Sequence, residues 1–136
     1  MAKIARFEDL DLWKGAVVIG VEIYKLTSTG RLEKDYSSKD QLRRAAISIS
    51  NNIAERFEYN NNKNFVKFPG YSKGSAGELR SNLLVLKEAK VISEESYHNL
   101  ESKLISVSKN ISRFIKYLKK LRMENRIYKI LQFLNF

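Results

Sequence analysis

The residues best suited to chemistry in this sequence are cations near its C-terminal end. Residues 113–136 hold seven lysines and arginines but only one acidic residue, Glu124, so they carry +6 of the net charge of +10. Such side chains bind phosphate oxygens without reading bases, which predicts a surface for RNA or DNA backbone. The alternative is a solvated helix face, since lysine near a helix C-terminus is favoured by the helix dipole. The candidate nucleic-acid-binding residues are Lys109, Arg113, Lys116, Lys119, Lys120, Arg122 and Arg126.

A second group of residues is suited to holding copies of the chain together. At helical spacing, Arg44, Asn51 and Glu55 share the face away from the expected core, and Ile47 points partly outward. An arginine and a carboxylate on such a face can form charge-assisted hydrogen bonds across a subunit boundary. These four residues are therefore candidates for an oligomer interface.

Small residues mark a third feature, beside Glu78. Gly70, Gly74 and Gly77 fall on one helical side, although glycine costs about 1 kcal/mol relative to alanine inside a helix. A stripe of this kind lets another backbone approach closely, so Gly74, Gly77 and Glu78 join the interface candidates. Equally, Gly70 and Gly74 can simply mark a break around Pro69.

The remaining inventory does not predict an enzyme. The single histidine, His98, projects opposite the expected core, and there is no cysteine to act as a nucleophile or a metal ligand. Neither a Glu-x-x-His pair nor a phosphate loop, nucleophile elbow or zinc spacing is present. We therefore expect no catalytic residue, no metal and no cofactor, and the absence of cysteine fits a cytoplasmic protein.

Four segments with helical periodicity must position these residues. They begin near Asp9, near Ser37 or Ser38, near Phe65 and after Ser93, and the links between them are short. The expected fold is all-α, an antiparallel up-down-up-down four-helix bundle over residues 1–121. Residues 122–136 form a basic and apolar tail that either extends the fourth helix or docks on a neighbour.

The apolar spacing also predicts which faces are buried. The first helix is expected to bury a stripe made of Leu10, Trp13, Val17, Val21 and Tyr24, which Ile23 and Leu26 widen. The second is expected to bury Leu42, Ala45, Ala46, Ile49, Ile53 and Phe57. Ser38 with Gln41, and Ser75 with Glu78, have the spacing of capping boxes, and Ser93 is the expected cap of the last helix.

The chain is not expected to enter a membrane. Its longest uncharged stretches are residues 15–21 and 45–54, well short of the roughly 18 residues that a span needs. Acidic residues within the first 13 positions interrupt any apolar run, which argues against a signal peptide.

Three segments resemble a known family. FEDLDLWKGAVVIGVEIYKLT, QLRRAAISISNNIAERF and KGSAGELRSNLLVLKEAKVIS occur in the order seen in bacterial proteins encoded in intervening sequences of 23S rRNA genes, also called S23 ribosomal proteins. The resemblance spans roughly residues 6–120. It implies a four-helix bundle and a ring-like homopentamer, without a settled biochemical activity. A related branch accompanies reverse transcriptases and binds nucleic acid through a basic surface.

Two positions depart from the family pattern. Arg56 stands where the family has a glycine, so a glycine helix end is lost there. Pro69 replaces an apolar residue, and proline inside a helix removes a hydrogen bond and clashes with the preceding turn. We therefore expect the third helix to be kinked or broken between Phe68 and Ser72.

Two functions from different classes follow from these observations. In the first, a non-catalytic oligomer binds nucleic acid through the summed basic faces of its subunits. In the second, a structural or adaptor oligomer binds a protein partner such as a reverse transcriptase, and the charge serves solubility.

Overall fold

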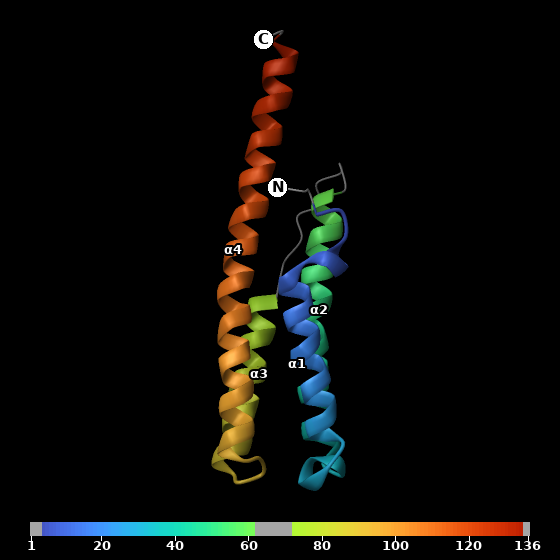
Figure 1. Ribbon diagram of the computed structural model, residues 1–136, viewed down its shortest axis with the longest axis vertical. Helices are drawn as coiled ribbons and strands as arrows, with labels where there is room; N and C mark the ends of the chain where they lie inside the picture. The colour runs from blue at the N-terminus through green and yellow to red at the C-terminus, as the bar shows by residue number, and fades with distance from the viewer. Residues whose placement is uncertain (1–3, 62–71, 135–136) are drawn as a thin grey trace.

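The computed structural model describes residues 4–61 and 72–134, and these residues form helices without a strand among them. The elements are η1 (Phe7–Asp9), α1 (Asp11–Thr27), η2 (Gly30–Glu33), α2 (Tyr36–Asn61), α3 (Ser72–Glu88) and α4 (Glu94–Phe133). Helix α1 packs on α2, α2 on α3, α3 on α4, and α4 again on α1, so the four helices enclose one core (Figure 1). The predicted all-helical fold with four helices is confirmed.

Each helix contributes apolar side chains to this core. Ile19, Ile49, Leu83 and Leu104, one from each helix in turn, have no exposed surface. Burying a side chain of this size stabilises the fold by about 1.5–3 kcal/mol. The buried face predicted for α2 is confirmed at all six positions, from Leu42 to Phe57.

The buried face of α1 differs from the prediction. Val21 and Tyr24 were expected in the core, yet they are 47% and 41% exposed. The residues that α1 buries are Ala16, Ile19, Ile23 and Thr27, of which Ile23 alone belonged to the predicted stripe. The first helix is apolar on more than one side, so spacing alone does not decide which side turns inward. The consequence is an apolar surface on the outside of α1.

A buried polar link joins the end of α1 to α2. The Thr27 hydroxyl donates to the carbonyl of Ile23 at 2.7 Å and accepts from Arg43 Nε at 2.8 Å. Arg43 also donates to Ser28 Oγ at 3.1 Å, and its guanidinium lies 4.2 Å from the ring centre of Tyr24. Because Thr27 is fully buried, this link satisfies a hydroxyl that would otherwise be costly to bury.

Replacing Arg43 with methionine should lower the free energy of unfolding by about 1–3 kcal/mol. Methionine keeps the apolar stem but leaves the Thr27 hydroxyl without its donor. Urea denaturation followed by circular dichroism measures the change, and Arg44→Met on the exposed side of the same helix is the control. Equal stability of the Arg43 variant and the parent would show that the link contributes nothing.

The start of α2 also differs from the prediction. Asp35 caps the helix, since its carboxylate accepts from the backbone N–H of Ser38 at 3.2 Å and from the Ser38 hydroxyl at 2.8 Å. The interpretation of Ser38 as the cap was wrong, and the helix begins earlier, at Tyr36. Between α3 and α4, Ser93 is the cap of α4, as predicted, because its hydroxyl oxygen accepts from the backbone N–H of Ser96 at 3.1 Å.

The departures from the family pattern have different outcomes. With Arg56 in place of glycine, α2 continues to Asn61. The expected break near Pro69 lies outside the described residues. Ser75 does not cap a helix, because α3 is already helical from Ser72. Instead, Ser75 is buried and its hydroxyl lies 2.8 Å from the hydroxyl of Ser48 on α2.

The tail is a continuation of α4, which has 40 residues and is therefore about 60 Å long. Leu118 is the last buried residue of the helix, and all described side chains from Met123 to Leu134 are exposed. Figure 1 shows this end of α4 standing clear of the other described elements. Residues 122–133 are thus helical and continuous with α4, and docking of this segment on a neighbour stays a prediction.

Candidate nucleic-acid interface and assembly surfaces

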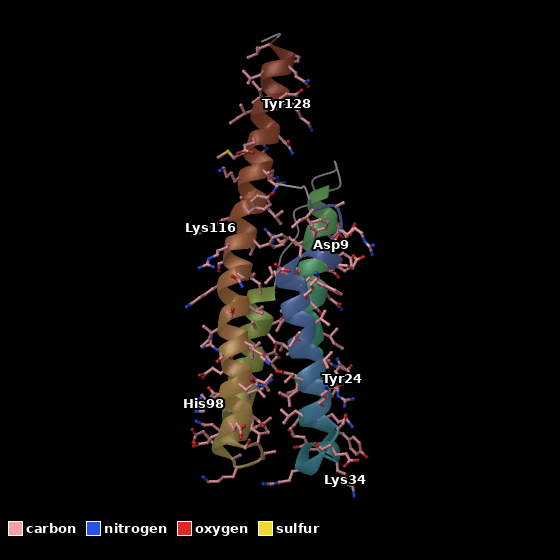
Figure 2. All side chains as sticks on the ribbon, in the orientation of Figure 1. Asp9, Tyr24, Lys34, His98, Lys116 and Tyr128 are labelled. Atoms are coloured by element: carbon pink, nitrogen blue, oxygen red, sulfur yellow. The ribbon has the colours of Figure 1, made fainter. Side chains whose placement is uncertain are left out.

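Four of the predicted nucleic-acid-binding residues form one row on α4. Lys109, Arg113, Lys116 and Lys120 follow each other at intervals of four, three and four residues, and all four are exposed. They face away from the buried side of the helix, and Figure 2 shows Lys116 on the side of α4 remote from the other helices. We call these four residues the outer basic row.

The outer basic row is not neutralised by the protein. Within residues 4–61 and 72–134, no carboxylate lies within ion-pair distance of its cations. Among these residues, Arg113 donates to the side-chain oxygen of Asn110, at 3.3 Å. At 1.5 Å per residue the row is about 16 Å long, which matches roughly five nucleotide steps of 3.4 Å. Its charges are thus available to an elongated polyanion.

The other three candidates lie elsewhere on the helix. Lys119 and Arg126 are exposed but do not belong to the row, while Arg122 is partly buried. Burial and the charge of Arg122 together lower the pKa of Arg56 on α2, which shows that the two guanidinium groups are close. Sequence reasoning grouped Arg122 with the exposed cations and did not include Arg56, because their proximity depends on how α2 meets α4.

The structure brings together the four interface candidates on α2. Arg44, Ile47, Asn51 and Glu55 line one hollow on the outer face of this helix. Arg44 already pairs within the helix, with Asp40 at 2.9 Å, and both side chains are largely exposed. Such a surface pair contributes at most about 1 kcal/mol, so Arg44 remains available for another partner.

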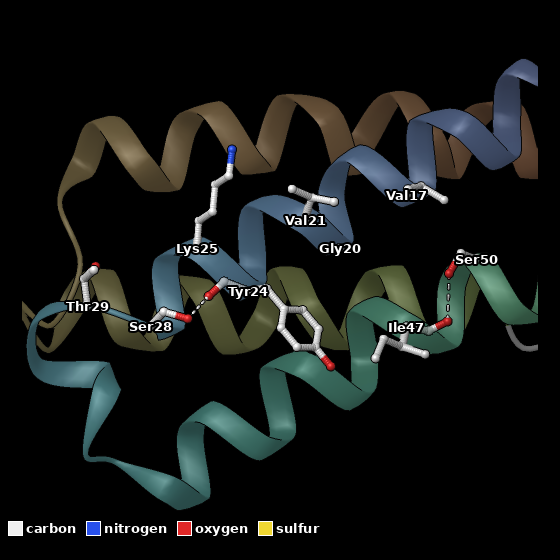
Figure 3. Close-up of a pocket in the computed structure, with 9 residues that line it drawn as sticks. All are labelled: Val17, Gly20, Val21, Tyr24, Lys25, Ser28, Thr29, Ile47 and Ser50. Carbon is white, nitrogen blue, oxygen red and sulfur yellow. Dashed lines mark hydrogen bonds between the residues drawn. The ribbon is translucent and has the colours of Figure 1, made fainter.

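An apolar groove runs beside this hollow, between α1 and α2. Val17, Gly20, Val21 and Tyr24 line it from α1, and Ile47 lines it from α2 (Figure 3). The groove has a volume of about 570 Å³. Sequence reasoning identified Ile47 but missed the α1 residues, because it had assigned Val17, Val21 and Tyr24 to the core. The sequence did contain a signal for the groove, because apolar residues of α1 occur on more than one side of the helix.

The small-residue candidates on α3 are separate from these surfaces. Gly74, Gly77 and Glu78 are exposed and line neither the groove nor the hollow. A methyl group added at Gly74 or Gly77 would meet nothing within 4 Å. Packing against the described residues therefore does not require glycine at either position.

Replacing Gly77 with alanine should raise the free energy of unfolding by up to about 1 kcal/mol, because alanine is the better helix former and has room. Thermal melting measures the gain. Gly30→Ala is the contrasting variant and should be destabilising, since Gly30 has a φ of +63°. If the stripe contacts another subunit, Gly77→Ala will also reduce the oligomer mass; unchanged mass with higher stability would exclude such a contact.

A metal site in the described part of the chain would need side chains grouped as metal ligands are. Across residues 4–61 and 72–134, no three histidine, cysteine or acidic side chains are grouped to hold a metal ion. His98 is exposed, and its Nδ1 lies 3.9 Å from a Glu101 oxygen. The Tyr97 hydroxyl donates to the same carboxylate, and this hydrogen bond raises the pKa of Tyr97. In these same residues, no helix has the length and apolarity required to cross a bilayer.

Taken together, the fold and its surfaces define a small basic protein built from four helices around one core. The family model of the 23S rRNA-intervening sequence protein matches residues 8–113, and the chain belongs to this family. The resemblance found in the sequence is thereby confirmed. No curated protein matches the chain. The matched range ends at Arg113, so Lys116, Lys120 and the end of α4 lie beyond it.

Proposed function

We propose that the protein is a non-catalytic oligomer of the cytoplasm that holds RNA or DNA backbone on the outer basic row, with consecutive helices of each subunit running antiparallel. The observation that supports this function most directly is the row itself. Its four exposed cations have no carboxylate partner among the described residues, and they are spaced along one straight line of α4.

The charge distribution supports the same proposal. Residues 102–136 hold nine basic residues and one acidic residue, so +8 of the net charge of +10 belongs to α4 beyond its first eight residues and to the residues after it. A concentrated positive field attracts polyanions, and each neutralised phosphate releases counterions.

Binding should be strong at low salt and should weaken steeply as salt rises. The expected log–log slope is roughly −0.9 per phosphate neutralised for duplex DNA and −0.7 for single strands. Fluorescence anisotropy with duplex RNA, single-stranded RNA and duplex DNA across a salt series measures the slope. Absence of binding to all three at 50 mM salt would contradict the proposed function.

Self-association is the second part of the proposal. The apolar groove between α1 and α2 and the hollow beside it offer adjacent apolar and charged surfaces, which is the composition of a subunit interface. The ring-like homopentamer implied by the family resemblance would place several outer basic rows on one particle. Light scattering coupled to size exclusion should then give a mass of several chains, five per ring being the favoured number.

The adaptor function remains the second candidate, and the groove is the observation that favours it. An apolar groove exposed on a subunit is also suited to a helix of a protein partner such as a reverse transcriptase. A pull-down with the folded protein as bait distinguishes the two, because groove variants should lose a protein partner whereas variants of the outer basic row should retain it.

A further inference from the structure

The end of α4 carries an exposed apolar seam. Met123, Ile127, Ile130 and Leu134 follow each other at intervals of four, three and four residues, and they are 64%, 54%, 58% and 53% exposed. This alternation is the spacing at which a helix presents a continuous stripe to another helix. We call these four residues the terminal seam.

The terminal seam faces away from its own bundle. Before Leu121, the apolar side of α4 packs in the core and the outer basic row faces away from it. At 100° per residue, the terminal seam lies on the same side of the helix as that row. The side of the extension that continues the core direction carries mainly charged residues, Arg122, Arg126 and Lys129, together with Phe133 at its end. The amphipathic pattern therefore inverts near Leu121, and among the described residues no element of the subunit covers the seam.

We propose that the terminal seam pairs with the terminal seam of a second copy of this chain, in an antiparallel two-helix contact. The seam is complementary to itself in this orientation. Met123 lies opposite Leu134 of the partner helix, and Ile127 lies opposite Ile130, so every position meets an apolar position. Such a contact is isologous, with the same patch used by both copies, and it closes as a two-fold pair.

Charge determines the orientation. In a parallel pair, the outer basic rows of both copies would lie against each other, and like charges at that spacing repel strongly. In the antiparallel pair, the two Lys120 residues are separated by 17 residues of helix rise, about 25 Å. This exceeds three Debye lengths of roughly 8 Å at physiological salt. The outer basic rows also remain open for a polyanion.

The pairing does not depend on the proposed function. If the bundles form a particle through other surfaces, the pairing predicts that two such particles associate through the ends of their α4 helices. If the bundles form rings, several terminal seams act together, and this multivalency strengthens a contact that is short in each pair.

The first experiment compares a change in the seam with a matched change on the opposite side of the same helix, which is the control. Ile127→Asp with Ile130→Asp places two carboxylates in the seam, whereas Asn125→Asp with Gln132→Asp places two on the face turned away from it. All four positions are exposed, so folding should survive, and circular dichroism verifies it. Light scattering should show the mass falling to one half in the seam variant and remaining at the parental value in the control.

The second experiment tests the orientation, using the absence of cysteine from the chain. Chains carrying Ile127→Cys are mixed with chains carrying Ile130→Cys, each with a tag of different mass, and then oxidised. The antiparallel pair gives the mixed disulfide. Homodimers of each variant instead of mixed dimers would indicate a parallel pair and overturn the proposal.

Other occupants of the seam give different results. An unchanged mass in the seam variant overturns the pairing. If the mass is unchanged while the parent, but not the seam variant, floats with vesicles containing anionic phosphatidylserine, the seam binds a lipid surface instead of a second copy. Binding of duplex RNA at low salt is measured on the same variants, so failure of the pairing and failure of the proposed function are distinguished.

Discussion

Replacing Arg113, Lys116 and Lys120 together with glutamine should lower the affinity for duplex DNA by about 500-fold at 0.1 M salt. Each neutralised phosphate contributes a log–log slope of roughly 0.9, so three lost contacts per binding chain remove about 2.7 decades at that concentration. The loss should be similar for every sequence, because lysine and arginine on phosphates carry no base code. A titration at several salt concentrations measures both the affinity and the reduction in slope.

The matched control also changes one arginine and two lysines to glutamine, at the other end of the bundle. Arg31, Lys34 and Lys90 are exposed on the connections between helices, and Figure 2 shows Lys34 far from Lys116. Both triple variants should fold, since exposed substitutions of this kind usually cost under about 0.5 kcal/mol each. Equal losses in the two variants would mean that net charge alone attracts the polyanion and that the outer basic row is not the site.

The fold was largely predictable where a helix has one apolar side. In α2, polar residues surround the stripe from Leu42 to Phe57, so helical spacing identified every buried position. In α1, valines and tyrosine extend the apolar surface beyond one side, and the choice of face follows from packing against α2 and α4. Thr27 illustrates the difficulty, because a polar residue is buried through its bond to Arg43, far away in the sequence.

In the candidate site, too, some features follow from spacing within one helix and others depend on how the helices pack. The outer basic row was predictable because it depends only on spacing within one helix. The position of Arg122 was not, since it depends on the approach of Arg56 from α2. The groove was not predicted either, because an apolar residue on an amphipathic helix is normally assigned to the core. Val21 and Tyr24 are exceptions whose exposure only the packed helices show.

The exposure of Val21 and Tyr24 leads to a second prediction with a large expected effect, which concerns assembly of the oligomer. Val21→Asp should dissociate the oligomer that we propose forms through the groove. Val21 is 47% exposed in the subunit, so a carboxylate there costs little in the isolated chain. In an interface the same carboxylate would lose its water without gaining a partner, at a cost of several kcal/mol for each contact.

The measured mass should fall to that of two chains joined by their terminal seams, and to 15.8 kDa when Ile127→Asp and Ile130→Asp are also present. Val18→Asp is a close control, because Val18 is on the same helix and is also 47% exposed, but lines a hollow between α1 and α4 instead of the groove. Light scattering should show the parental mass for Val18→Asp. An intact oligomer in the Val21 variant, or equal dissociation in both variants, would show that the groove is not the subunit interface.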